Sequence, residues 1–166
     1  MLLRKPKEED QARLMDYMME HYANGEMSIS ASNGLPTMPY KEWLEKLKDD
    51  ESGKNEDWGI SETYILLNDN RVVGMINIRY TLSEDKVEKY GHIGYGVRPT
   101  ERRKGYATYM LKEALEKCRE RNMKEVILGC YEDNLASRNT ILNNDGVIYR
   151  KGKLKNKTSL YYKITL

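Results

Sequence analysis

The segment from Val97 to Thr108 holds the residues whose types and spacing best suit chemistry. A basic cluster, Arg102-Arg103-Lys104, comes directly before Gly105 and Ala107, where a strand pattern gives way to a helix pattern. A helix start offers unpaired backbone N–H groups, the basic side chains add positive charge, and the small residues allow close approach. These features suit a bound diphosphate, and a solvated basic turn is the alternative. Since the spacing matches neither a Walker loop nor a Gly-x-Gly-x-x-Gly fingerprint, we expect a different large anionic cofactor.

Three predicted elements position this segment. A strand pattern runs from His92 to Val97, and its glycines indicate a bulge or the close approach of another group to the backbone. The helix that follows carries its apolar residues on one face, from Ala107 to Cys118, and the apolar run 126–130 is typical of a buried strand. A strand, helix and strand in this order form a parallel pair with a crossover helix. The basic segment therefore lies at the carboxyl end of a central strand.

The remaining patterns predict a mixed α/β sheet. Helical spacing covers Leu14 to His21 and Tyr40 to Leu47, a hairpin covers 63–80, and Asn134 is a plausible N-cap of a short helix that contains Ile141 and Leu142. Two closing strands, 147–149 and 160–166, are separated by a basic turn at 151–157, and no element is assigned to the charged stretch 83–89.

Length and composition predict a single domain that needs neither a metal ion nor a disulfide for its stability. The chain has 166 residues, and its 28 basic and 26 acidic residues are well mixed, which argues against a dedicated nucleic-acid binder. Cys118 and Cys130 lack metal-ligand spacing and are predicted to be reduced core residues. No signal peptide is evident, and no apolar run approaches the roughly 20 residues that span a bilayer. We expect a cytoplasmic protein with no membrane partner.

The spacing Arg102-x-x-Gly105-x-Ala107 resembles the central motif of the Gcn5-related N-acetyltransferase (GNAT) superfamily, Arg/Gln-x-x-Gly-x-Gly/Ala. The strand ending in Val97 precedes it, as in that family, and Asn134-x-x-Ser137 resembles the family's Asn-x-x-Ala/Ser motif. The resemblance extends from about residue 64 to residue 149. It implies a mostly antiparallel sheet of six to seven strands, split between two central parallel strands and flanked by about four helices. It also implies acceptor-side elements at 1–60, an acetyl-CoA-binding core at 61–150 and a closing strand at 151–166.

The resemblance further implies direct transfer of an acetyl group from acetyl-CoA to a primary amine, without a metal. In the family a backbone N–H near Val97 stabilises the oxyanion. The acceptor is a small-molecule or protein amine, and the protein is a monomer or homodimer. The implied cofactor contacts are Tyr95, Val97, Arg98, Arg102, Arg103, Lys104, Gly105, Tyr106, Ala107, Thr108, Asn134 and Ser137.

The catalytic proton transfers are less clearly encoded. The family often has a tyrosine acid four residues after its Ala/Ser, where this chain has Ile141. Tyr131 and Tyr149 are candidate acids by position, although a thiol with a pKa near ~8.5 needs little help to leave. His92 is the candidate base, because a pKa near ~6.5 suits that task, and a half-buried strand histidine is its alternative role. A non-catalytic acyl-CoA-binding or regulatory module is the alternative function.

Overall fold

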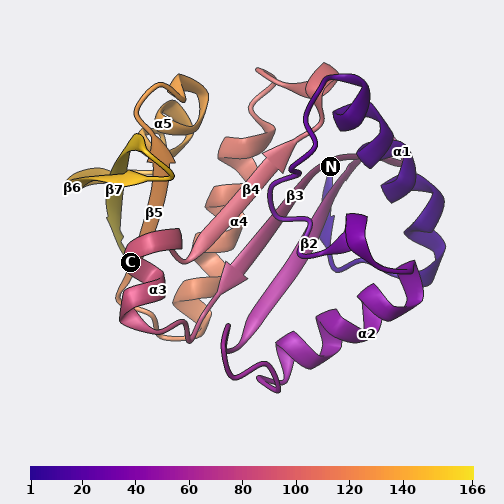
Figure 1. Ribbon diagram of the computed structural model, residues 1–166, viewed down its shortest axis with the longest axis horizontal. Coiled ribbons are helices and arrows are strands. Elements are labelled where there is room, and N and C mark those ends of the chain that lie inside the picture. Colours follow the sequence, from indigo (N-terminus) through magenta and orange to yellow (C-terminus); the bar gives the residue numbers. More distant parts are fainter.

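The computed structural model describes residues 1–166, in which seven strands form two antiparallel sheets (Figure 1). The larger sheet has the order β1 (Leu2–Arg4), β2 (Ser61–Asn68), β3 (Arg71–Arg79) and β4 (Ile93–Val97). The smaller has the order β5 (Glu125–Tyr131), β7 (Lys157–Thr165) and β6 (Val147–Leu154). The helices are α1 (Gln11–Ala23), α2 (Tyr40–Glu51), α3 (Glu84–Tyr90), α4 (Tyr106–Glu120) and α5 (Leu135–Leu142). The split α/β sheet predicted from the sequence is confirmed.

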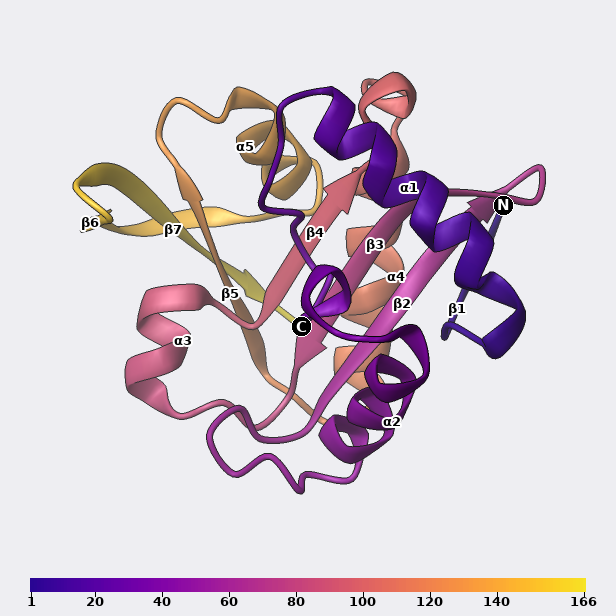
Figure 2. The same cartoon turned by 45° about the vertical axis from the view of Figure 1, so that its right-hand side comes forward.

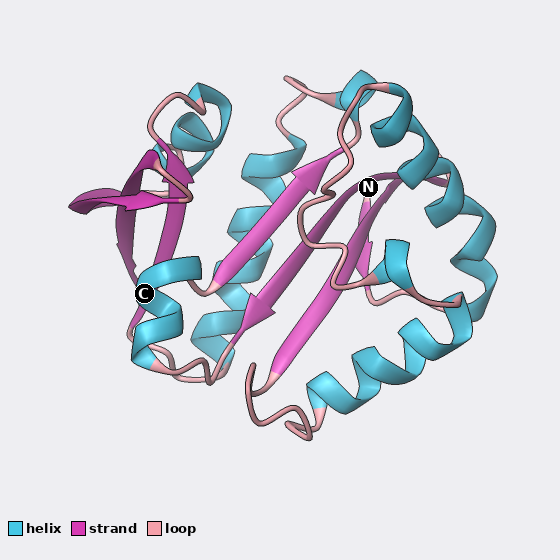
Figure 3. Cartoon of the chain, in the orientation of Figure 1, coloured by secondary structure: helices cyan, strands magenta, loops and turns pink.

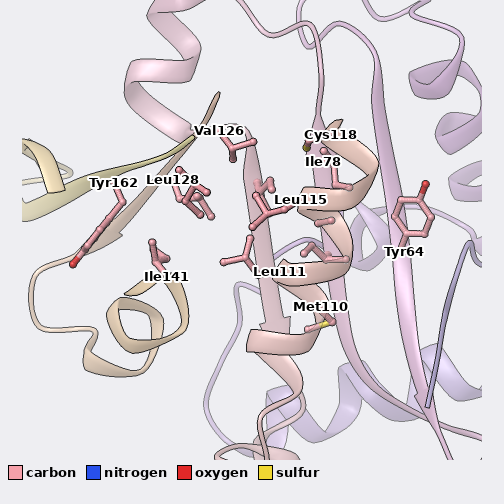
Figure 4. Close-up of a cluster of buried hydrophobic side chains, with 14 of the residues drawn as sticks. Tyr64, Ile78, Met110, Leu111, Leu115, Cys118, Val126, Leu128, Ile141 and Tyr162 are labelled. Carbon is pink, nitrogen blue, oxygen red and sulfur yellow. The ribbon is translucent and has the colours of Figure 1, made fainter. Parts of the chain in front are cut away.

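Helices cover both faces of the larger sheet (Figures 1 and 3). Successive side chains of β3 alternate between the faces. Ile76 and Ile78 pack in the cluster that contains the apolar face of α4, while Met75 packs in the cluster built from α1 and α2. Figure 4 shows the first cluster, in which Met110 and Leu111 of α4 lie among the buried strand residues. Because both faces are covered, β2 and β3 are buried along most of their length.

The two sheets meet at one point between β4 and β5 and diverge beyond it. The N–H of His92 donates to the carbonyl of Ile127 at 2.7 Å, and the N–H of Ile127 donates to Nδ1 of the His92 ring at 2.9 Å. Helix α4 connects the two strands, as expected, and in both views they run in the same general direction and separate toward their carboxyl ends (Figures 1 and 2). The separation creates an opening in the middle of the combined sheet.

Two parts of the fold differ from the sequence prediction. The charged stretch 83–89 contains most of α3, a short helix that buries only Val87 and therefore carries almost no apolar periodicity. The closing strands are also longer than predicted, because β6 and β7 extend through the basic segment to a tight turn at Lys155 and Asn156, both with positive φ. None of the helices combines the length and hydropathy needed to cross a bilayer.

Candidate functional site

A cavity of about 260 Å³ occupies the opening between β4 and β5. One wall comes from Ile93, Gly94 and Tyr95, and the other from residues 128–131 of β5. Asn134, Ser137 and Ile141 line it from the start of α5 and the turn before it. The cavity therefore lies beside Tyr95, Asn134 and Ser137, three of the residues that the family resemblance implies as cofactor contacts.

Strand register determines which backbone groups face this opening. In an antiparallel pair, residues alternate between those that bond their partner and those that point away. The N–H of Arg98 donates to the carbonyl of Val73 at 2.9 Å, and the register continues through Gly96 and Gly94. Tyr95 and Val97 therefore direct their N–H groups away from β3 toward the opening. Their N–H groups are therefore free to bond a ligand, whereas the Val97 carbonyl already accepts from Nε of Arg102 at 3.2 Å.

The same reasoning applies to the opposite wall. The N–H of Glu132 donates to the carbonyl of Thr158 at 3.0 Å, so the even-numbered residues of β5 bond β7. Gly129 and Tyr131 consequently face the opening. Two strand edges thus oppose each other across the cavity, and each presents backbone groups that an extended amide-containing ligand could bond.

The start of α4 presents a row of unpaired donors. No backbone or side-chain acceptor bonds the six N–H groups from Arg103 to Thr108, and the first helical bond is donated by Tyr109 to Gly105. Arg103 and Gly105 both have positive φ, of 61° and 82°, which turns successive N–H groups to one side. A Cβ at Gly105 would meet nothing within 4 Å, so the loop is open to solvent at this point. The geometry suits an anion such as a diphosphate.

The basic side chains of this loop are partly neutralised. Nη2 of Arg102 lies 2.6 Å from Glu26 Oε2, and Nζ of Lys104 lies 2.8 Å from Glu101 Oε2. The hydrogen bond from Arg102 outweighs the effect of burial and lowers the pKa of Glu26 to about 2. Arg103 forms no ion pair, so its charge is the one most available to a ligand. Backbone donors therefore contribute more to this site than the basic composition suggests.

The assignment of Arg98 to the cofactor site is wrong. Its N–H bonds β3, and its side chain is 0% exposed, with Nε donating to the carbonyl of Val72 at 2.6 Å. Nη1 pairs with Glu20 at 2.8 Å and with Asp16 at 2.9 Å. Arg98 anchors α1 to the sheet, because it directly follows β4 and lies on the same side of the sheet as Gly96, which faces Tyr17 of α1.

The structure also contradicts His92 as the base. Its ring does not line the cavity, and its Nδ1 lone pair accepts the Ile127 N–H at 2.9 Å. A neutral ring bonded in this way carries its proton on Nε2 and has no second lone pair to accept another. Burial lowers the pKa of His92, which keeps the ring neutral. The residue closes the joint between the two sheets, a role that depends on a backbone partner the sequence does not reveal.

The two candidate tyrosine acids occupy different environments. Tyr131 lines the cavity at the end of β5. Tyr149 lies on β6, is 42% exposed and packs beneath Lys163, so it is removed from the candidate acids. The hydroxyl of Tyr95 also lies in this region, 2.9 Å from Oγ of Ser137, and burial raises its pKa to about 12.

The predicted pair at the start of α5 lies at the cavity. Oδ1 of Asn134 accepts the Ser137 N–H at 3.1 Å, so Asn134 caps the helix while it lines the cavity. Ser137 holds the hydroxyl of Tyr95. Helix capping and ligand contact are therefore compatible for these two residues.

Sequence reasoning missed a second cavity of about 340 Å³, lined mainly by the segment 29–34, α2 and the end of β3. Gly94 and Gly96 were the available signal, because a close approach to the backbone was expected there. A Cβ at Gly94 would lie 3.2 Å from Nη2 of Arg79, and one at Gly96 would lie 3.2 Å from the Ser30 carbonyl oxygen. Neither glycine has a positive φ, so close packing explains both.

Comparison with known proteins identifies a family model and many similar structures. The model of the acetyltransferase (GNAT) family matches residues 30–141. The chain superposes on an N-acetyltransferase from Staphylococcus aureus Mu50 with a TM-score of 0.70 and 12% identity, covering 99% of this chain and 97% of that one. A putative acetyltransferase from Salmonella typhimurium, solved with its cofactor acetyl-CoA, gives a TM-score of 0.70 and 13% identity, covering 99% of this chain and 92% of that one.

A ribosomal-protein-alanine N-acetyltransferase from Brucella melitensis gives a TM-score of 0.68 and 16% identity over 100% of both chains. At these identities the structural matches support the fold alone. Comparison with curated protein sequences gives no match.

Proposed function

The chain belongs to the acetyltransferase (GNAT) family, and on this basis we propose that it transfers the acetyl group of acetyl-CoA directly to a primary amine of a small molecule or protein. Acetyl transfer in general follows from the family. The observation that carries the proposal for this chain is the row of six unpaired N–H groups beside the opening between β4 and β5.

The residues of the opening fit the donor molecule. A diphosphate would be held by the N–H groups from Arg103 to Thr108 and by the Arg103 side chain, where the helix dipole also favours negative charge. An arm containing amides would lie between β4 and β5, where Tyr95 and Gly129 present backbone groups from opposite walls. Bound acetyl-CoA supplies an activated thioester.

The protein contributes orientation and electrostatic stabilisation. The free N–H of Val97 can donate to a carbonyl oxygen that gains negative charge during attack by the amine. A C–N bond forms, a C–S bond breaks, and the proton lost by the amine balances the one gained by the thiol. Tyr131 remains the candidate donor of that proton among the two tyrosines proposed from sequence. Because His92 cannot serve as the base, we assign removal of the amine proton to water in the open cleft.

Release of free thiol from acetyl-CoA in the presence of a panel of amines tests this function. We expect binding of acetyl-CoA by calorimetry and amine-dependent thiol release, with the acetylated amine identified by mass spectrometry. Binding without thiol release for any amine would instead support a non-catalytic acyl-CoA-binding module. If the protein neither binds acetyl-CoA nor releases thiol from it, the assignment of the cleft is refuted.

A further inference from the structure

The second cavity lies on the face of the larger sheet that α1 and α2 cover, beside the end of β3. Asn77 and Arg79 enter it from β3, because alternate residues of that strand share a face with Met75. Lys46 and Asp50 enter it from α2, and Trp58 from the segment before β2. The arrowhead of β3 in Figure 1 marks this end of the strand, between α2 and α3.

The two cavities adjoin across β4. Asn77 is the register partner of Gly94, which also lines the cavity between β4 and β5. Because Gly94 has no side chain, nothing on β4 separates the Arg79 guanidinium from the strand backbone, and Nη2 lies 3.2 Å from the position a Cβ would occupy. Ser30 also lines the opening, while its neighbours Ile29 and Ala31 line the second cavity, so a ligand in the second cavity would lie next to the opening.

Arg79 is a partly buried cation without an acidic partner. Nη1 donates to the carbonyls of Gly91 at 3.0 Å and Tyr90 at 3.4 Å, and the guanidinium lies 5.8 Å from the Trp58 ring centroid. Nε and Nη2 donate to no protein group, and burial alone lowers the pKa of Arg79. These two nitrogens form the edge that binds a carboxylate through two parallel hydrogen bonds. A desolvated guanidinium with this edge open indicates an anionic ligand.

The other polar groups leave this charge uncompensated. Asp50 is 3% exposed and is satisfied by Lys46 at 2.6 Å, Asn33 at 2.9 Å and Asn55 at 3.3 Å. Its charge is therefore balanced by Lys46 within the cavity wall. Asn77 uses its amide nitrogen to bond Thr63 and the Glu62 carbonyl, while its side-chain oxygen accepts no hydrogen bond. That oxygen is available to an N–H donor.

We propose that this cavity binds the acceptor of the acetyl group and that the acceptor is an amino acid, meaning a compact molecule that carries both an amino group and a carboxylate. Arg79 holds the carboxylate through Nε and Nη2, and the side-chain oxygen of Asn77 faces the amino group. Polyamines and other polycations are disfavoured by the unpaired guanidinium. This inference deepens the proposed transferase function and rests on it.

Matched pairs of acceptors test the role of the carboxylate. Thiol release from acetyl-CoA is measured with free amino acids and their carboxamides, including glycine with glycinamide and β-alanine with β-alaninamide to vary the spacer. Charge-assisted hydrogen bonds of this kind are worth a factor of about 10 to 150. We expect the best free acid to exceed its amide in kcat/KM by at least about tenfold. Equal rates for acid and amide, or a preference for polyamines, would overturn the proposal.

Variants at Arg79 connect this preference to the residue. Arg79→Gln should abolish the difference between acid and amide, and Arg79→Lys should retain part of it because the charge remains without the planar fork. Arg119→Gln is the matched control, since Arg119 pairs only with Glu116 on the exposed face of α4. Unchanged acetyl-CoA affinity in Arg79→Gln shows that the variant folds. An undiminished preference for the acid in that variant would refute the assignment.

A binding measurement separates failure of this inference from failure of the transferase function. Titration of the wild-type protein with an N-acetyl amino acid and with its amide, followed by calorimetry and by tryptophan fluorescence, requires no turnover. We expect the acid to bind more tightly by at least about tenfold, and Arg79→Gln to remove the difference. If amines that lack a carboxylate support thiol release and the acid does not bind, the transferase function stands and an amino-acid acceptor is excluded. If the acid binds but no amine supports thiol release, the carboxylate-binding site at Arg79 stands and the transferase function is excluded.

Discussion

Replacing Gly105 with asparagine should weaken acetyl-CoA binding without unfolding the protein. Gly105 is the N-cap of α4, its φ is 82°, and a Cβ there would meet nothing within 4 Å. Asparagine tolerates this backbone region better than most residues, and its side chain would enter the open space beside the unpaired N–H groups. The variant should therefore block access of a ligand to at least one of the six free donors.

The size of the effect follows from the kind of bond that is lost. A hydrogen bond from an N–H to a charged group is worth about 1.5 to 3 kcal/mol, so the Kd for acetyl-CoA should rise by about 10- to 150-fold. Gly105→Asp places a side chain of the same size there and adds a negative charge, whose repulsion at 4 Å is worth between about 1 kcal/mol in water and about 4 kcal/mol at an effective dielectric constant of 20. Its affinity should fall further, and most steeply at low ionic strength.

Calorimetric titration with acetyl-CoA measures both losses, and thermal unfolding monitors the fold. Gly25→Asn is the control, because Gly25 has a φ of 78° and equally empty surroundings but does not lie in the row of free donors. Strain of about 1 kcal/mol should lower Tm by about 2 to 4 °C in either asparagine variant. Wild-type affinity in Gly105→Asn would refute the role assigned to these N–H groups, and an equal loss in Gly25→Asn would show that the effect is indirect.

Three further predictions concern titration and the tyrosines. His92→Asn keeps an acceptor for the N–H of the partner strand but cannot titrate, so the pH–rate profile should keep its shape, measured by thiol release between pH 6 and 9. For Glu62, burial raises the pKa, but hydrogen bonds from two tyrosines and a lysine lower it to about 2. This carboxylate therefore contributes stability above its ordinary pKa of 4.5, on the order of 3 kcal/mol, which is lost as pH falls from about 5 to 2. In Glu62→Gln, the free energy of unfolding measured with urea should therefore fall less between pH 5 and 2 than it does in the wild type. Tyr149→Phe should retain wild-type kcat, whereas Tyr131→Phe should lower it, because only Tyr131 lines the cavity.

Each of these predictions has a clear contrary result. Loss of one limb of the pH–rate profile in His92→Asn would restore histidine as the base. An unchanged acid transition in Glu62→Gln would show that this carboxylate is not stabilised by its neighbours. Equal activity in the two phenylalanine variants would remove Tyr131 from the proton transfer.

The split sheet could be predicted from the sequence because local patterns determine its central elements. The apolar face from Ala107 to Cys118 identified α4, and the adjoining strand patterns placed the basic segment at a strand end. Asn134 was recognisable as a cap because capping depends on a residue three positions away, Ser137. Features that are determined by residues close together in the sequence, such as helix faces and caps, could therefore be predicted.

The errors depend on contacts between distant parts of the chain. Arg98 lies in a basic, ligand-like context, but its partners Asp16 and Glu20 are on α1, and its position directly after β4 turns it toward them. His92 bonds the backbone of Ile127, and no side-chain pattern marks such a partner. The second cavity was missed for the same reason. That Arg79 has no acidic partner becomes visible only when the folded structure shows which residues surround it.

Amide hydrogen exchange with and without acetyl-CoA tests the assignment of the cleft most directly. The N–H groups of Arg103 to Thr108, Tyr95 and Val97 donate to no protein acceptor and should exchange rapidly in the free protein. Acetyl-CoA should slow their exchange. Gly94, Gly96 and Arg98 already bond β3 and should be protected in both states. Protection at a different set of residues, or no change at the start of α4 and along β4 when acetyl-CoA binds, would contradict the proposed site.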